Sequence, residues 1–147
     1  MTYDDALWHH EPAALAGLKP ESAGTHIGMF LAWAQLAGLG SDLRFLWDPQ
    51  IERLRARTMS PGEWFIQICG EKFVDVFLNE EGNSFASSYY DGSEQYPLDY
   101  AATLAAGVET LYEVPDGWAT FDQLAPVLDG RLAQWRLGDL GVANDNN

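Results

Sequence analysis

Residues 24–40 read GTHIGMFLAWAQLAGLG, and this stretch decides the fold. Between His26 and Leu39 the one clearly polar side chain is Gln35, so a helix built from these residues is apolar on nearly every side. Its apolar run is shorter than the roughly 20 residues that cross a bilayer. The stretch therefore predicts a buried central helix around which the other elements pack.

Start and stop signals in the sequence predict where this helix and the helices that follow it begin and end. Thr25 is predicted to cap its first turn. The Asp-Pro pair at 48–49 is typical of a helix start, and the sequence SPGE at 60–63 has the spacing of a capping box with proline at the first helical position. Gly70 then ends that helix.

The second half of the chain predicts three more helices. Residues 80–91, 97–106 and 118–136 carry apolar side chains at helical spacing between glycine or proline signals. Pro126 interrupts the last of these patterns. Either a kink or a helix start near Asp122 would reconcile this proline with the apolar stripe.

Two segments are harder to assign from their residue types. Residues 73–78 would suit a short strand, but no other segment shows matching strand patterning, so a helical or irregular segment is predicted. The opening 23 residues contain two prolines and no long periodic run. They are predicted to wrap the surface, with Leu7 and Trp8 anchored in the core.

Length and composition predict one all-α or mostly α domain of about five to seven helices. The chain has 147 residues, of which 47% are hydrophobic. The predicted boundaries are a globular helical domain over residues 1–137 and a flexible tail over 138–147. Cys69 is the single cysteine, which excludes an intrachain disulfide framework and suits a small core residue. No secretion signal is recognisable at the start, so a cytoplasmic location is expected.

The charge balance is the most informative bulk property. The chain has 22 acidic side chains against 8 lysines and arginines, for a net charge of −14. Nucleic-acid binding is disfavoured because phosphate contacts need clustered cations, whereas a basic protein partner is favoured. The alternative is that the surplus acid only keeps the protein apart from its neighbours.

The segment at 79–91, which is both acidic and aromatic, is the best candidate for a partner-binding surface. Its carboxylates and rings suit the recognition of Arg and Lys side chains, although an ordinary capped helix would use the same residue types. The predicted partner-binding residues are Glu80, Glu81, Tyr89, Tyr90, Asp91 and Glu94, with Asp116 and Asp122 as further members.

The three histidines, His9, His10 and His26, form no recognisable metal motif such as HExxH, so no metal site is predicted. His26 falls in the first turn of the central helix, where the helix dipole disfavours a charged imidazole, so a neutral ring is expected. A polar site is predicted at His10, Thr25 and His26. The alternative is that His26 only satisfies buried backbone or a tyrosine hydroxyl.

No catalytic or cofactor signature is present. The chain has no GxSxG, no Walker A loop and no GxGxxG after a strand, so neither a catalytic residue nor a cofactor is predicted. The alternative hypothesis is a small hydrolase or metal-dependent enzyme, whose side chains would have to converge in one cleft: His10, His26, Glu80, Glu81 and Asp91.

Three motifs carry a family resemblance: WHH near the start, GTHIGMFLAW in the central stretch and LNEEGNSFASSYYD later. In order and spacing, from about Tyr3 to Trp135, they resemble a family of small acidic bacterial proteins of unassigned function. Such proteins are similar in type to the immunity partners of bacterial toxins. The resemblance implies a non-enzymatic protein that binds and inhibits a cognate, basic toxin, with a regulatory adaptor as the alternative.

Overall fold

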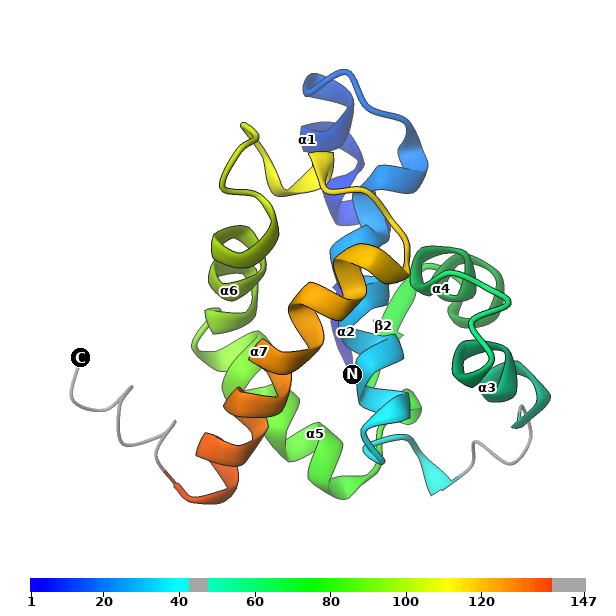
Figure 1. Ribbon diagram of the computed structural model, residues 1–147, viewed down its shortest axis with the longest axis vertical. Coiled ribbons are helices and arrows are strands. Elements are labelled where there is room, and N and C mark those ends of the chain that lie inside the picture. The colour runs from blue at the N-terminus through cyan, green and yellow to red at the C-terminus, as the bar shows by residue number, and fades with distance from the viewer. Residues whose placement is uncertain (43–47, 139–147) are drawn as a thin grey trace.

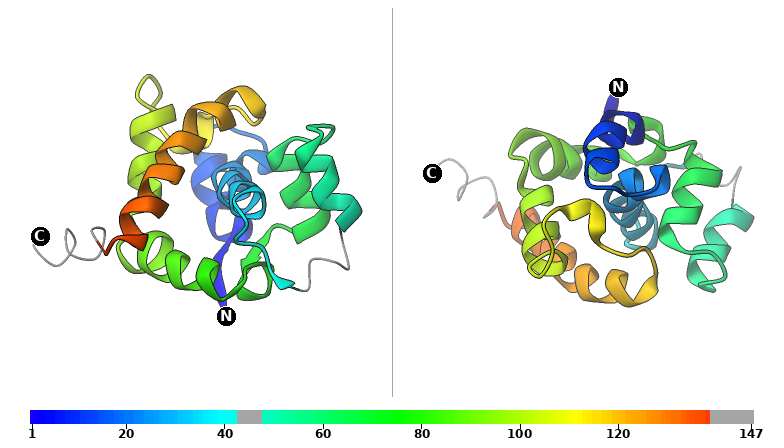
Figure 2. Two further views of the ribbon diagram at one scale, coloured as in Figure 1. Left: turned by 60° about the horizontal axis from the view of Figure 1, so that its bottom comes forward. Right: turned by 90° about the horizontal axis from the view of Figure 1, so that it is seen from above.

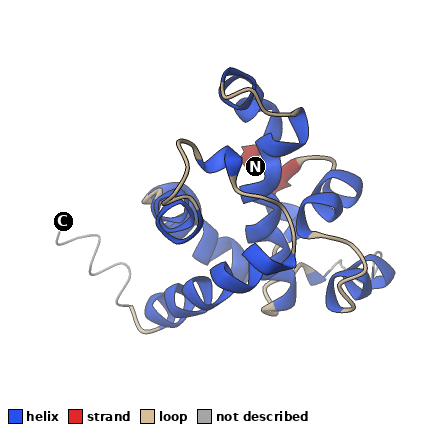
Figure 3. Ribbon diagram, turned by 45° about the horizontal axis from the view of Figure 1, so that its top comes forward, coloured by secondary structure: helices blue, strands red, loops and turns tan. Residues whose placement is uncertain are grey.

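The computed structural model describes residues 1–42 and 48–138, which form a mostly helical single domain with a small two-stranded sheet (Figures 1 and 3). Its α-helices are α1 (His10–Leu15), α2 (Thr25–Leu36), α3 (Asp48–Arg55), α4 (Pro61–Cys69), α5 (Glu80–Ala86), α6 (Gln95–Leu104) and α7 (Trp118–Arg136). The strands are β1 (Thr2–Asp5) and β2 (Lys72–Val74). Short helical turns connect them: η1 (Ala6–His9), η2 (Pro20–Gly24), η4 (Asp75–Phe77), η5 (Ser87–Gly92) and η6 (Leu111–Glu113). The predicted fold class is confirmed.

Helix α2 is the centre of the domain, as the apolar stretch predicts. The left view of Figure 2 looks nearly along α2, with α6 and α7 on one side and α3 and α4 on the other. Every residue from Thr25 to Gln35 is buried. The Phe30 ring lies 5.0 Å from that of Tyr90 and 5.1 Å from that of Tyr96, so α2 supplies the core of an aromatic cluster.

Close packing of α2 against α4 depends on Gly28. A Cβ atom at Gly28 would lie 2.9 Å from the Cβ of Phe65 and 3.0 Å from the carbonyl oxygen of Pro61. Neither atom is the end of a flexible side chain. The absence of a side chain at this position therefore lets the two helices approach.

The predicted boundaries of α4 are confirmed. The Ser60 hydroxyl accepts a hydrogen bond from the Glu63 backbone N–H, and the Glu63 carboxylate accepts one from the Ser60 N–H. Gly70 follows with a φ of 64°, the left-handed conformation that closes many helices. Thr25, by contrast, is not a cap. The chain is already helical in η2, so α2 begins without a side-chain cap.

The prediction of a helical or irregular segment over residues 73–78 is wrong for residues 73–74, which belong to β2, and holds for Asp75–Phe77, which form η4. Strand β2 pairs antiparallel with β1, and the following η4 turn is helical. The partner strand was missed because it lies in the first five residues and lacks alternating polarity. Both Tyr3 and Asp4 are buried, and the strand register shifts between Thr2 and Asp4. At this shift β1 has one more residue than β2, as in a β-bulge, and the regular ladder is interrupted.

The last helix runs from Trp118 through Pro126 to Arg136, so the alternative start near Asp122 is wrong. Leu7 and Trp8 are 67% and 59% exposed, and the prediction that they anchor the N-terminal segment in the core is also wrong. The predicted tail falls, apart from Gly138, outside the described residues. None of the helices described is both long and apolar enough to cross a bilayer.

Candidate functional site

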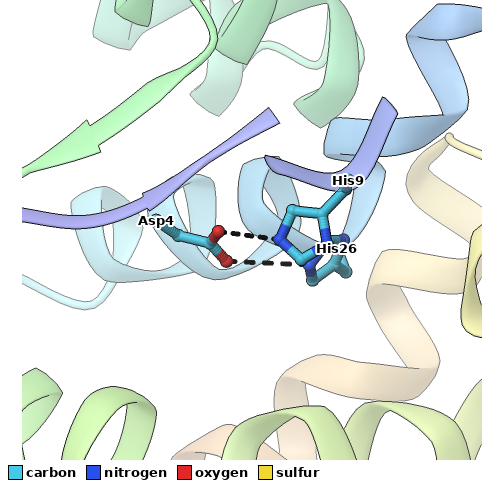
Figure 4. A group of neighbouring side chains, drawn as sticks. All are labelled: Asp4, His9 and His26. Carbon is cyan, nitrogen blue, oxygen red and sulfur yellow. Dashed lines mark hydrogen bonds and ion pairs between the residues drawn. The ribbon is translucent and has the colours of Figure 1, made fainter. Parts of the chain in front are cut away.

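Three side chains from the N-terminal part of the chain meet in one place (Figure 4). Asp4 comes from β1, His9 from the end of η1 and His26 from the first turn of α2. The Nε2 atom of His9 lies 2.7 Å from Oδ1 of Asp4, and Nε2 of His26 lies 3.7 Å from Oδ2 of the same carboxylate. We refer to Asp4, His9 and His26 as the Asp–His cluster.

Local structure explains why these side chains converge. Asp4 follows the register shift in β1 and is buried, as the preceding Tyr3 is, so β1 does not alternate between buried and exposed side chains. The next residue, Asp5, caps η1 by accepting a hydrogen bond from the Leu7 N–H at 2.9 Å. This cap starts the turn that carries His9 back to the Asp4 carboxylate.

Two tyrosine hydroxyls form hydrogen bonds with Asp4 and His9 of the Asp–His cluster. The Tyr90 hydroxyl donates a hydrogen bond to Oδ2 of Asp4 at 2.6 Å. The Tyr112 hydroxyl lies 2.6 Å from Nδ1 of His9. The cluster thus joins β1 and η1 to η5 and η6, which lie far apart in the sequence.

Burial and the neighbouring groups shift the pKa values of Asp4 and His26. Burial tends to raise the pKa of Asp4, but hydrogen bonds from His9 and Tyr90 and the nearby imidazoles hold this pKa below its ordinary value. Burial, together with the nearby His9, lowers the pKa of His26 to about 3. The His26 ring is neutral, as predicted, although burial rather than the helix dipole is the main cause.

The imidazole of His26 makes no hydrogen bond within the described chain. Its side chain is 4% exposed, its Nδ1 atom has no partner, and the 3.7 Å from Nε2 to Asp4 is too long for a hydrogen bond. The Tyr96 hydroxyl donates to the backbone carbonyl of His26 rather than to its ring. The alternative prediction, that the His26 ring forms a hydrogen bond with a buried backbone group or a tyrosine hydroxyl, is therefore wrong for the described residues.

A groove of about 230 Å³ opens at the Asp–His cluster. Its lining residues are Tyr3, Asp4, Trp8, His9, Tyr90, Asp91, Glu94 and Pro97. Trp8, Asp91 and Glu94 are exposed at the surface. The groove therefore combines an exposed indole and two carboxylates at its rim with the partly buried carboxylate of Asp4 inside. We call it the acidic groove.

The predicted surface tyrosines belong to the core. Tyr89 is 0% and Tyr90 is 6% exposed. The Tyr89 hydroxyl donates to Asp99 at 2.7 Å, just as that of Tyr90 donates to Asp4. The predicted role as a surface anchor is therefore wrong for Tyr89, whereas the nearly buried Tyr90 lines the acidic groove.

Three of the predicted acids are already engaged within the chain. Glu81 accepts two hydrogen bonds from Arg136, and Asp122 accepts two from Arg57. Asp116 accepts from the Gly62 N–H at 2.9 Å and so stabilises the start of α4. The other three, Glu80, Asp91 and Glu94, are exposed and form no ion pair with a described residue.

Three residues were predicted to form a polar site, and of these only His26 belongs to the Asp–His cluster. His10 lies outside it, and the buried Thr25 lines a different hollow, together with Tyr112 and Asp116. In the described chain, the one group of three metal-ligand side chains within reach of each other is Asp4, His9 and His26. Glu80 and Glu81 are not members, so the structure does not bring together the predicted hydrolase residues.

Sequence reasoning missed Asp4, His9 and Tyr112. An available signal was the dense run YDDALWHH over residues 3–10, in which acids and histidines lie within a few residues of each other. This run predicts a cluster of side chains only once the strand β1 and its register shift are known.

The fold and the site define a mostly helical domain that carries a buried Asp–His cluster beside an acidic groove. The chain belongs to the family described as Domain of unknown function (DUF7832), whose match covers residues 2–114. No curated protein and no solved structure matches the chain. The matched part contains the whole cluster and groove and ends before α7, whereas the resemblance was expected to reach about Trp135.

Proposed function

We propose that this protein is an immunity-type protein that binds a cognate toxin or effector protein through the acidic groove. The observation that carries the proposal is the rim of this groove, where Asp91 and Glu94 have no counter-ion in the described chain and stand beside the exposed indole of Trp8. The expected partner presents a basic side chain there and acts in the cytoplasm.

The distribution of charge supports a basic partner. Four of the arginines pair with acids inside the chain: Arg55 with Glu52, Arg57 with Asp122, Arg131 with Asp99 and Arg136 with Glu81. Among the described residues these pairs engage four acidic side chains, and Asp91 and Glu94 are among the acids that form no ion pair there. The negative electrostatic potential of these unpaired carboxylates speeds the approach of a positively charged protein and repels nucleic acid.

The groove has the chemistry of a pocket for a single Arg or Lys side chain. At about 230 Å³ it is smaller than the roughly 300–1,000 Å³ of most small-molecule sites. A guanidinium over the Trp8 ring would gain a cation–π contact, and the carboxylates of Asp91 and Glu94 would accept its hydrogen bonds. A central anchor of this kind supplies much of the affinity of protein interfaces.

Charge reversal tests which acids the partner contacts. Asp91→Lys should weaken binding of the product of the neighbouring gene at least tenfold in a pull-down or titration. Glu80→Lys is the matched control. It makes the same change in net charge at the other end of the α5–η5 helix, roughly 16 Å away at 1.5 Å per residue. If Glu80→Lys alone weakens binding, the groove is not the contact.

Co-expression tests the immunity function itself. Cells that produce the neighbouring toxin should grow when the wild-type protein is present and stop growing with Asp91→Lys. Binding without rescue of growth would contradict immunity and indicate a regulatory adaptor. Absence of both binding and rescue would overturn the proposal.

A further inference from the structure

The Asp–His cluster contains the atoms of a metal site. One carboxylate oxygen and two imidazole nitrogens, from Asp4, His9 and His26, all lie within 4.8 Å of one another. In a tetrahedral site with bonds of about 2.0–2.1 Å, ligand atoms lie roughly 3.3 Å apart. The distances of 2.7 Å from Nε2 of His9 to Oδ1 of Asp4 and 3.7 Å from Nε2 of His26 to Oδ2 end on different carboxylate oxygens and lie on either side of that value. We propose that the cluster binds one divalent transition-metal ion of the Zn²⁺ type.

The unpaired imidazole of His26 is an independent observation that points to a ligand. A buried polar atom without a hydrogen bond costs free energy, and nearly all such groups in folded proteins have a partner. The His26 side chain is 4% exposed, and its Nε2 atom faces the Asp4 carboxylate at 3.7 Å, a distance too long for a hydrogen bond. A metal ion between these atoms would accept the lone pair that no described residue uses.

Outer contacts of the cluster suit metal ligation. With Nε2 of His9 on the metal, its Nδ1 carries the proton and donates to the Tyr112 hydroxyl, which lies 2.6 Å away. The hydrogen bond from Tyr90 orients the Asp4 carboxylate in the same way. The proton now shared between His9 and Asp4 moves to Nδ1 or leaves to solvent.

The ligand set selects the class of ion. Two imidazoles and one carboxylate suit Zn²⁺ and its first-row neighbours, whereas Ca²⁺ and Mg²⁺ prefer sites built of oxygen atoms. The acidic groove is lined by Asp4 and His9, so it gives an ion a path to the cluster through a field of negative charge. Three protein ligands leave a fourth position open for water or another group.

Metal binding is tested on the full chain without any partner protein, so its result is independent of the proposed immunity function. After treatment with chelator, the wild-type protein is titrated with Zn²⁺ by calorimetry and with Co²⁺ by visible absorption. We expect one ion per chain, a Co²⁺ spectrum of low coordination number, and a melting temperature raised by Zn²⁺ but not by Mg²⁺. If the wild-type protein shows no saturable Zn²⁺ binding, the proposal is overturned whatever the variants do.

Variants locate the ion. Asp4→Asn and His9→Gln keep the size of the side chain and should each weaken Zn²⁺ binding at least tenfold. His10→Gln is the matched control, because it removes the adjacent histidine, which lies outside the cluster, and should leave the affinity unchanged. Circular dichroism confirms that each variant folds. Equal affinity for wild type and His9→Gln would place the ion on surface carboxylates and contradict the site.

Discussion

The guanidinium of Arg131 on α7 donates two hydrogen bonds to the carboxylate of Asp99 on α6, at 2.8 and 3.0 Å. Tyr89 and Gln95 donate to the same carboxylate. Asp99 is 9% exposed, so this is a nearly buried, fully paired acid that joins two neighbouring helices. It contrasts with the exposed pair formed by Glu81 and Arg136.

Replacing Asp99 should destabilise the fold far more than replacing Glu81. Asp99→Asn leaves the buried part of Arg131 without its charge partner and should cost about 2–3 kcal/mol in the free energy of unfolding. Glu81→Gln breaks an exposed pair and should cost less than about 1 kcal/mol. Urea unfolding at pH 7 measures both values. Equal costs would contradict the assignment of Asp99 as a structural anchor.

The same pair predicts a pH dependence of stability. Burial tends to raise the pKa of Asp99, but the hydrogen bonds from Arg131, Tyr89 and Gln95 hold it below the ordinary value of 3.8. The stabilisation is therefore complete well above pH 3.8 and is lost as the pH falls through the lower pKa of the folded state. Between pH 6 and pH 3, the wild-type protein should lose more stability than Asp99→Asn does.

Two buried tyrosines should respond oppositely to loss of the hydroxyl group. Tyr90→Phe removes the hydrogen bond to Asp4 and should cost about 1–2 kcal/mol of stability. The Tyr100 hydroxyl is buried and has no hydrogen-bond partner among the described residues, so Tyr100→Phe should be neutral or slightly stabilising. Thermal and urea unfolding of the two variants checks this difference. A cost for Tyr100→Phe as large as that for Tyr90→Phe would contradict it.

Two helical glycines give a matched test of packing. Gly28→Ala forces a methyl group against Phe65 and the Pro61 carbonyl and should destabilise the protein by about 1–2 kcal/mol. Gly130 in α7 has nothing within 4 Å of an added Cβ, so Gly130→Ala should stabilise by up to about 1 kcal/mol through helix propensity. Stabilisation by both substitutions would show that α2 and α4 can separate without cost.

The thiol of Cys69 should be inert in the folded protein. Burial raises the pKa of this thiol, so little thiolate forms at neutral pH. A thiol reagent such as Ellman's reagent should modify Cys69 rapidly in urea and only slowly in native buffer. Rapid modification of the native protein would contradict its placement in the core.

Much of the fold follows from local signals in the sequence. The apolar run of α2 and the capping box of α4 need only neighbouring residues to be recognised, and both predictions hold. Strand β1 could not be predicted in this way. Its pairing with β2 joins residues about seventy positions apart, and its bulge removes the alternation by which a strand is recognised.

The candidate site was harder to predict because side-chain direction and counter-ions decide it. Tyr89 and Tyr90 lie within two residues of Asp91 in the sequence, yet both are buried because aromatic area gains more from burial in the core around α2. Glu81 and Asp122 look available until their arginine partners are known. The overall charge, which requires no geometry, remains the most direct sequence argument for a basic partner.

The pairing of β1 with β2 imposes an order on folding during synthesis. Asp4, His9 and His26 leave the ribosome early, but β1 can pair only when Phe73 and its neighbours have been synthesised. Tyr90 and Tyr112, which hold the outer atoms of the cluster, emerge later still. A nascent chain therefore carries the side chains of the Asp–His cluster unassembled until its second half has been translated.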